Sequence, residues 1–170
     1  LRLDSKLKET LEETQKVRKT SLTYAMEAGT QRLRDVINKG ITEENLMSSV
    51  SDAFAGGWSS VKLYFMFGLP TETTGDLNGI ADLASKVVRK YFETPKNVRA
   101  RGLRVNCSAS CFVPKPFTPF QWEPQDTAED LRRKQRLLRE SVTTRKISLN
   151  WHDADVSFLE AVLARGDRRL

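Results

Sequence analysis

Polar side chains that alternate with apolar ones along two short segments are the residues best placed to do chemistry in this sequence. Residues two apart point to the same side of an extended strand, so the polar and apolar sets would occupy opposite faces. The polar set is Lys62, Tyr64, Asn106, Ser108 and Ser110. A parallel sheet covered on both sides is apolar throughout, whereas polar side chains from consecutive strands indicate a concave, ligand-lined surface. A hydrogen-bonded core at these positions explains the pattern equally well.

Histidine and cysteine, the most reactive residue types, are sparse. His152 is the single histidine and precedes Asp153, and a carboxylate can orient an imidazole as a general base. Because His152 has no cluster of partner residues, we interpret it as structural. Cys107 and Cys111 lie four apart in one extended segment, a separation that cannot close a disulfide. We interpret both cysteines as buried strand positions.

The elements that must position these residues alternate between helices and strands. Apolar residues at helical spacing follow cap residues Thr42, Thr73 and Thr127, and a further helix is predicted over 5–18. Segments rich in β-forming residues come after the helices, at 22–26, 61–67, 103–113 and 147–150. This alternation indicates parallel βαβ units. The predicted fold is therefore α/β, a partial (β/α) TIM-type barrel segment with parallel strands, outer helices and about four βα units.

Two residues and one loop lie where such a fold places its sites, at the carboxyl ends of the strands. Glu27 follows the first predicted strand and Gly68 follows the second. The proline-rich segment 115–125 comes after the third strand. It is predicted to be an extended loop, either a lid over the barrel mouth or a rigid surface crossing.

Four stretches at these strand ends resemble the radical SAM enzymes. They are Thr23–Glu44, Val61–Thr73, Phe112–Pro124 and Asn150–Asp153. In this order and spacing they are most similar to an uncharacterised group of Fe-S oxidoreductases that carry a cobalamin-binding-type domain ahead of the radical SAM domain. The resemblance covers nearly the whole chain. It implies that residues 1–150 are the C-terminal portion of the radical SAM barrel and that residues 151–170 are a C-terminal extension of it.

The resemblance implies cofactor-binding roles for five residues. Glu27 and Lys39 match positions that contact S-adenosylmethionine, the lysine at its amino-acid end. Met66, Phe67 and Gly68 match the segment that contacts adenine, with Met66 or Phe67 packing on the base and glycine allowing its close approach. The polar set described above would then face the substrate.

Simpler interpretations of two of these positions remain open. Glu27 is close enough in sequence to Arg32 and Arg34 to form a surface ion pair with either. Gly68 and Pro70 are also the residues that a tight turn from strand to helix requires.

The same resemblance implies an activity for the intact protein and a departure in this chain. The intact enzyme would cleave S-adenosylmethionine at a 4Fe-4S cluster to make a 5'-deoxyadenosyl radical, and cobalamin is left open. However, the C-x-x-x-C-x-x-C motif is absent, since the third position after Cys107 and Cys111 falls on Pro114. We therefore expect the chain to lack the first barrel strands and the cluster loop, to hold no metal or cofactor alone, and to be inactive alone.

Composition and charge narrow the expected partners. The chain of 170 residues has a net charge of +6, and no apolar stretch is long enough to span a membrane. Its cationic runs at 132–139 and 165–169 are interpreted as a solvated helix face and a basic tail. The expected partners are the missing N-terminal part of the same polypeptide or a second copy paired at the exposed barrel edge, in the cytoplasm. An RNA-binding or RNA-modifying module is the alternative function, and an independent α/β enzyme is a third.

Overall fold

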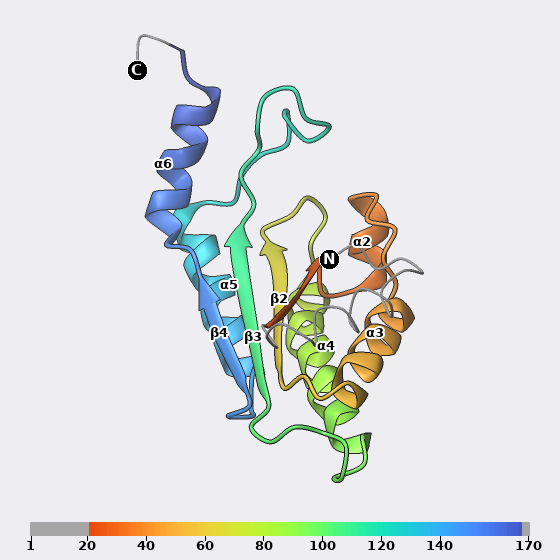
Figure 1. The fold of residues 1–170 in the computed structure, drawn as a ribbon. Helices are drawn as coiled ribbons and strands as arrows, with labels where there is room; N and C mark the ends of the chain where they lie inside the picture. The colour runs from red at the N-terminus through yellow and green to blue at the C-terminus, as the bar shows by residue number, and fades with distance from the viewer. Residues whose placement is uncertain (1–20, 168–170) are drawn as a thin grey trace.

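Four parallel strands in sequential order form the sheet of the computed structural model, which describes residues 21–167 (Figure 1). The strands are β1 (Leu22–Glu27), β2 (Ser60–Phe67), β3 (Arg104–Cys111) and β4 (Ile147–Trp151). Each neighbouring pair is parallel and hydrogen-bonded, in the order β1-β2-β3-β4. The predicted α/β fold, a partial (β/α) segment, is confirmed. The predicted helix over 5–18 lies outside the described residues.

The helices begin at the polar caps that the sequence carries. They are α2 (Gln31–Val36), α3 (Glu43–Ala55), α4 (Thr74–Glu93), α5 (Ala128–Ser141) and α6 (Ala154–Arg165). Thr42 and Thr73 each form a capping box with the residue three positions on, and the Thr127 hydroxyl accepts the backbone N–H of Asp130. These side chains satisfy N–H groups that the first helical turn leaves unpaired. The three caps predicted from the sequence are confirmed, whereas α2 and α6 were not predicted.

One face of the sheet carries the core, and among residues 21–167 no helix covers the other face, which we call the open face. The helices α3, α4 and α5 lie on the covered side (Figure 1). Leu63, Phe65 and Phe67 of β2 are at most 1% exposed there, in one apolar cluster with residues from these helices. On the opposite face Lys62 and Tyr64 are exposed. The strict alternation therefore agrees with the cover that the described helices give to one side of the sheet.

Close backbone contact joins the end of β1 to the start of α4. A Cβ atom at Gly29 would lie 2.4 Å from both the Asp76 carbonyl oxygen and the Ile80 nitrogen, so only glycine fits. The buried Asp76 carboxylate accepts hydrogen bonds from the Thr30 hydroxyl, the Arg32 guanidinium and, at 2.8 Å, the Thr73 backbone N–H. Burial alone would raise the pKa of Asp76, but these hydrogen bonds outweigh it and lower the pKa well below its usual range. This junction fixes the loop after β1.

The carboxyl ends of the strands are framed by α2, by the long β3–α5 loop and by α6, which extend beyond the sheet (Figure 1). The loop base is tied to α6 because Gln125 Nε2 donates to the carbonyl oxygens of Phe112 and Ser157, each at 3.1 Å. Among residues 21–167, no helix has the length and apolarity needed to cross a bilayer.

Candidate functional site

A cavity of about 630 Å³ lies at the carboxyl ends of the strands. Its walls come from the ends of β1, β2 and β3, the segment after α2, the β3–α5 loop, the residue after β4 and α6. The lining residues are Glu27, Ile37, Lys39, Met66, Leu69, Ser110, Cys111, Phe112, Val113, Lys115, Thr118, Pro119, Phe120, His152 and Glu160. Four residues predicted from the sequence, namely Glu27, Lys39, Met66 and Ser110, are thus brought together here.

Glu27 and Lys39 are paired with each other on the cavity wall. The Lys39 ammonium lies 3.3 Å from the Glu27 carboxylate, and both side chains are about one-third exposed. Glu27 has a φ of 66° and follows a register shift between β1 and β2. A left-handed backbone is unfavourable for glutamate, and such strain is concentrated at functional sites.

The simpler interpretation of Glu27 as a surface partner of Arg32 or Arg34 is wrong. Arg32 pairs with Asp76. Arg34 is buried and donates to the Ala28 carbonyl oxygen at 2.9 Å. Both arginines therefore hold the loop after β1, and Glu27 is left to face the cavity with Lys39.

The three residues that end β2 have different surroundings. Met66 lines the cavity, whereas Phe67 is fully buried on the helix-covered face. Gly68 has a φ of 77°, and a Cβ there would meet Asp126 Oδ2 at 2.9 Å and Leu131 Cδ2 at 3.2 Å. The glycine is thus required by the turn and its packing. Of the two side chains predicted to pack on a base, only Met66 has access to the cavity.

The predicted substrate-facing residues form rows across the open face. In register, Lys62 lies beside Asn106, Tyr64 beside Ser108 and Met66 beside Ser110. The side chains at 62 and 64 are exposed and those at 106, 108 and 110 are half-buried. Only Ser110 reaches the cavity. The row positions therefore continue the open surface from the cavity toward the amino ends of the strands.

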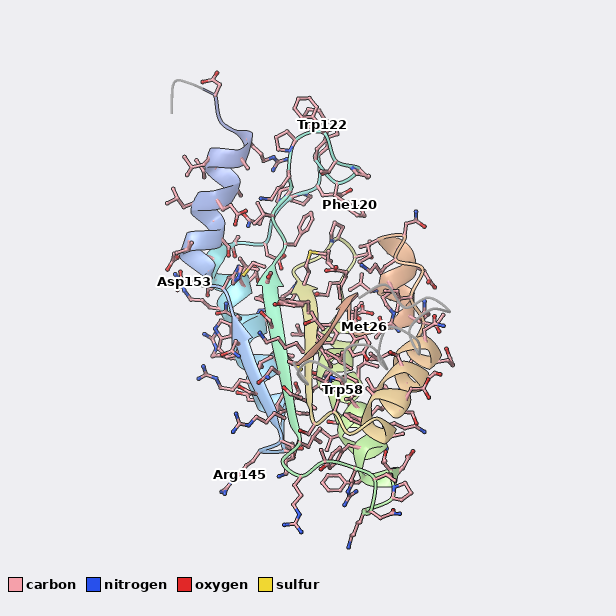
Figure 2. All side chains as sticks on the ribbon, in the orientation of Figure 1. Met26, Trp58, Phe120, Trp122, Arg145 and Asp153 are labelled. Carbon is pink, nitrogen blue, oxygen red and sulfur yellow. The ribbon has the colours of Figure 1, made fainter. Side chains whose placement is uncertain are left out.

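The β3–α5 loop contributes aromatic and charged residues that the sequence prediction missed. The rings of Phe112 and Phe120 meet edge to face, with centroids 6.2 Å apart, at the cavity. The Lys115 ammonium pairs with Glu160 of α6 at 2.5 Å. Trp122, 85% exposed, lies at the far end of the loop and points away from the body (Figure 2). The prediction of an extended segment is wrong, because residues 116–123 form successive turns in which the backbone N–H groups of Gln121 and Glu123 donate to the carbonyl oxygens of Thr118 and Phe120. The bulky aromatic residues of the segment were the signal for a cavity wall.

His152 and Asp153 do not form a catalytic pair in this geometry. The Asp153 carboxylate caps α6 by accepting the backbone N–H groups of Asp155 at 2.9 Å and Val156 at 3.1 Å. The exposed His152 side chain lines the cavity, whereas Asp153 is not among the cavity-lining residues. Asp153 is therefore the residue in the sequence that marks the start of α6, as its N-cap. It does not orient His152.

Both cysteines are free and buried, as predicted from their positions in one strand. Burial raises the pKa of the Cys107 thiol to about 12 and also raises that of Cys111. Thiols in this state are poor nucleophiles and poor metal ligands. Within the described part of the chain, no group of three or more histidine, cysteine or acidic residues could hold a metal ion.

A charged cluster behind the cavity fixes the β2–α4 turn. The Lys134 ammonium of α5 lies 2.8 Å from the Glu72 carboxylate and 2.7 Å from that of Asp126. Glu72 also accepts the Gly68 backbone N–H at 3.0 Å. Burial raises the pKa of Glu72, partly offset by these contacts. The cluster holds the turn against α5 and lies outside the cavity.

Comparison with known proteins gives a relative but no activity. No family model matches this chain. The chain is 33% identical over 150 residues to an uncharacterized protein of Methanocaldococcus jannaschii, a match that covers 88% of this chain and 31% of that protein. The chain thus spans about a third of the length of the relative it matches.

Proposed function

We propose that this chain forms part of the S-adenosylmethionine-binding barrel of a radical SAM enzyme, as the sequence resemblance implies. The observation that carries the proposal is the Glu27–Lys39 pair, at 3.3 Å, on the wall of a cavity at the carboxyl ends of parallel strands. The amino-acid end of S-adenosylmethionine bears one ammonium and one carboxylate. Glu27 and Lys39 offer a complementary charge to each, in charge-assisted hydrogen bonds.

The size and lining of the cavity support binding of the rest of this ligand. Its volume of about 630 Å³ is within the range of about 300–1,000 Å³ that small-molecule sites occupy. Met66 and Phe120 offer apolar surface for a flat base. In the intact enzyme, S-adenosylmethionine would supply the 5'-deoxyadenosyl radical that abstracts hydrogen from a substrate. This chain's own residues would bind and orient S-adenosylmethionine and, through the β3–α5 loop, exclude water.

The described residues do not fit an iron-sulfur cluster. Cluster ligation uses several cysteine thiolates, and the two cysteines here are buried in β3 with raised pKa values. We propose that the cluster is held by another part of a longer polypeptide, which agrees with the greater length of the relative. No described residue favours cobalamin in particular.

We further propose that additional polypeptide, or a second copy of the chain, covers the face of the sheet opposite the helices. Tyr64 on this face is 39% exposed. The absence of a membrane-crossing helix among residues 21–167 and the free cysteines support the cytoplasmic location implied by the resemblance.

Calorimetric titration of the intact protein, with its cluster loaded, tests the proposal. S-adenosylmethionine should bind saturably, and Glu27→Gln should weaken binding about tenfold, because a hydrogen bond to a charged acceptor contributes roughly 1.5–3 kcal/mol. The matched control is Glu160→Gln. Glu160 lines the same cavity and pairs with Lys115, but its side chain is 45% exposed, so binding should change less than about twofold.

Two results would contradict the proposal. One is an intact, cluster-loaded protein that does not bind S-adenosylmethionine. The other is an equal loss of affinity in Glu27→Gln and Glu160→Gln, which would mean that the cavity responds to charge in general and that Glu27 has no particular role.

A further inference from the structure

Cations without a carboxylate partner among residues 21–167 gather at the amino ends of β3 and β4 and along β4 as far as Trp151. Two hollows, of about 290 Å³ and about 500 Å³, are lined by consecutive residues of the chain, Lys146 in the first and Arg145 and Ile147 in the second. Their cationic lining residues, which we call the basic surface, are Lys96, Arg99, Arg101, Arg139, Arg145 and Lys146. No acidic side chain lines either hollow. In Figure 2 Arg145 lies at the end of the molecule opposite Phe120 and Trp122.

The fold does not use these six cations in ion pairs. Within residues 21–167, none of the six pairs with a carboxylate. By contrast, Arg132, Arg133 and Lys134, in the arginine-rich run of α5, each have an acidic partner. The six cations line two adjacent hollows among whose described lining residues there is no acidic side chain, so the local potential there is positive.

Aromatic rings hold two of the arginines in place. The Arg99 guanidinium lies 5.0 Å from the ring centroids of both Tyr91 and Phe92 and donates to the Phe92 carbonyl oxygen at 3.1 Å. The Arg139 guanidinium lies 4.8 Å over the ring of Trp151. A guanidinium stacked on a ring is preorganised, and its N–H edge can bind phosphate oxygens.

We propose that the basic surface binds the phosphate backbone of a nucleic acid. The cations come from separate segments, 96–101, 139 and 145–146, and run from the amino ends of the strands along the outer edge of β4. An extended polyanion can contact all of them, whereas a single phosphate cannot. Arg99 and Arg139 lie in hollows over aromatic rings, which suits a phosphate backbone better than a flat lipid surface. The proposal is independent of S-adenosylmethionine binding, since the cavity and the basic surface share no lining residue.

Salt-dependent binding of a fluorescein-labelled oligouridylate to the full chain, followed by anisotropy, tests the proposal. The Arg101→Gln/Lys146→Gln double variant removes two exposed cations from the basic surface. It should weaken binding by a similar factor for oligonucleotides of different sequence. The slope of log affinity against log salt should fall by about 1.4, at about 0.7 for each lost contact with single strands.

The matched control is Arg89→Gln/Arg136→Gln, which removes the same charge from exposed positions that line neither hollow. It should retain at least half of the affinity and the original slope, and both double variants should keep the thermal midpoint. Absence of salt-dependent oligonucleotide binding, or equal losses in the two variants, overturns the proposal. A membrane result would also overturn it. In that result the chain binds phosphatidylserine vesicles more tightly than the oligonucleotide, and vesicle binding is lost in Arg101→Gln/Lys146→Gln but kept in Arg89→Gln/Arg136→Gln.

Discussion

The two faces of the sheet are built from the same strands but have opposite surroundings. Leu63, Phe65 and Phe67 of β2 are buried beneath helices, whereas Lys62 and Tyr64, between them in sequence, are exposed. Apolar burial on one face supplies the stability of the fold. The other face contributes little to that stability and is free to carry polar side chains toward a ligand. Alternate residues of one strand can therefore serve different roles, one set stabilising the fold and the other contacting a ligand.

The largest expected effect contrasts neighbours on the two faces. Phe65→Ala should lower the free energy of unfolding by about 3–5 kcal/mol, because it leaves a cavity in the core. Tyr64→Ala should change it by less than about 0.5 kcal/mol, since Tyr64 is 39% exposed. Urea unfolding followed by circular dichroism measures both. A loss at Tyr64 as large as that at Phe65, measured on the monomeric chain, would contradict the separation of the two faces.

The next largest effect concerns the junction between β1 and α4 on the covered side. Gly29→Ala should destabilise the chain by about 1–3 kcal/mol, because the new Cβ would collide with the backbone of α4. Gly40→Ala is the control, since no atom lies within 4 Å of the Cβ position there. It should be neutral or stabilising by up to about 1 kcal/mol. Similar thermal unfolding midpoints for the two variants would contradict the close packing described.

The pH dependence of stability sharpens the same contrast. Asp76, which is buried at the junction, has a lowered pKa in the folded state. Its contribution is therefore fully present above the unfolded-state pKa of about 4 and is lost as the pH falls below that value. Asp76→Asn should lower stability at pH 7 by about 1 kcal/mol or more, as expected for a lost cap, and should flatten the acid limb. Denaturant unfolding between pH 7 and pH 3 measures the difference. An acid limb with unchanged slope would show that Asp76 is not the group responsible.

The smallest expected change in stability is at Glu27, on the open side. Glu27→Gln should leave the free energy of unfolding within about 0.5 kcal/mol of the original. Glu27→Gly should leave it unchanged or raise it by about 1 kcal/mol, because glycine adopts a φ of 66° without strain. Calorimetric unfolding distinguishes the variants. Marked destabilisation in both would make Glu27 part of the fold, and its assignment to a ligand site would fail.

Local patterns in the sequence determined most of the elements. The positions of β1 to β4 follow from apolar runs, and Thr42, Thr73 and Thr127 mark helix starts, because strand alternation and capping depend on residues a few positions apart. The short helix α2 escaped prediction since six residues show little periodicity. Helix α6 escaped because its outward face is apolar, with Phe158, Leu159 and Leu163 exposed, which obscures the usual division into faces.

For the candidate site, the resemblance to radical SAM enzymes implied Glu27, Lys39 and Met66, and strand alternation indicated Ser110. Glu27 could also be placed at the site because it follows a strand, and the carboxyl ends of parallel strands carry the sites of such folds. Only the tertiary structure showed that Glu27 pairs with Lys39, that Phe67 belongs to the core and that Phe120 closes the cavity wall. Each depends on a backbone turn or a contact with a distant segment, which sequence spacing does not encode.

Charge gives the clearest division between what each level determined. The sequence by itself fixed the net charge of +6 and pointed to the arginine-rich run of α5. The fold neutralised Arg132, Arg133 and Lys134 of that run with carboxylates. It also brought scattered cations, such as Arg101 and Lys146, into one surface. Pairing depends on which side chains meet in space, so electrostatic potential is a property of the tertiary structure.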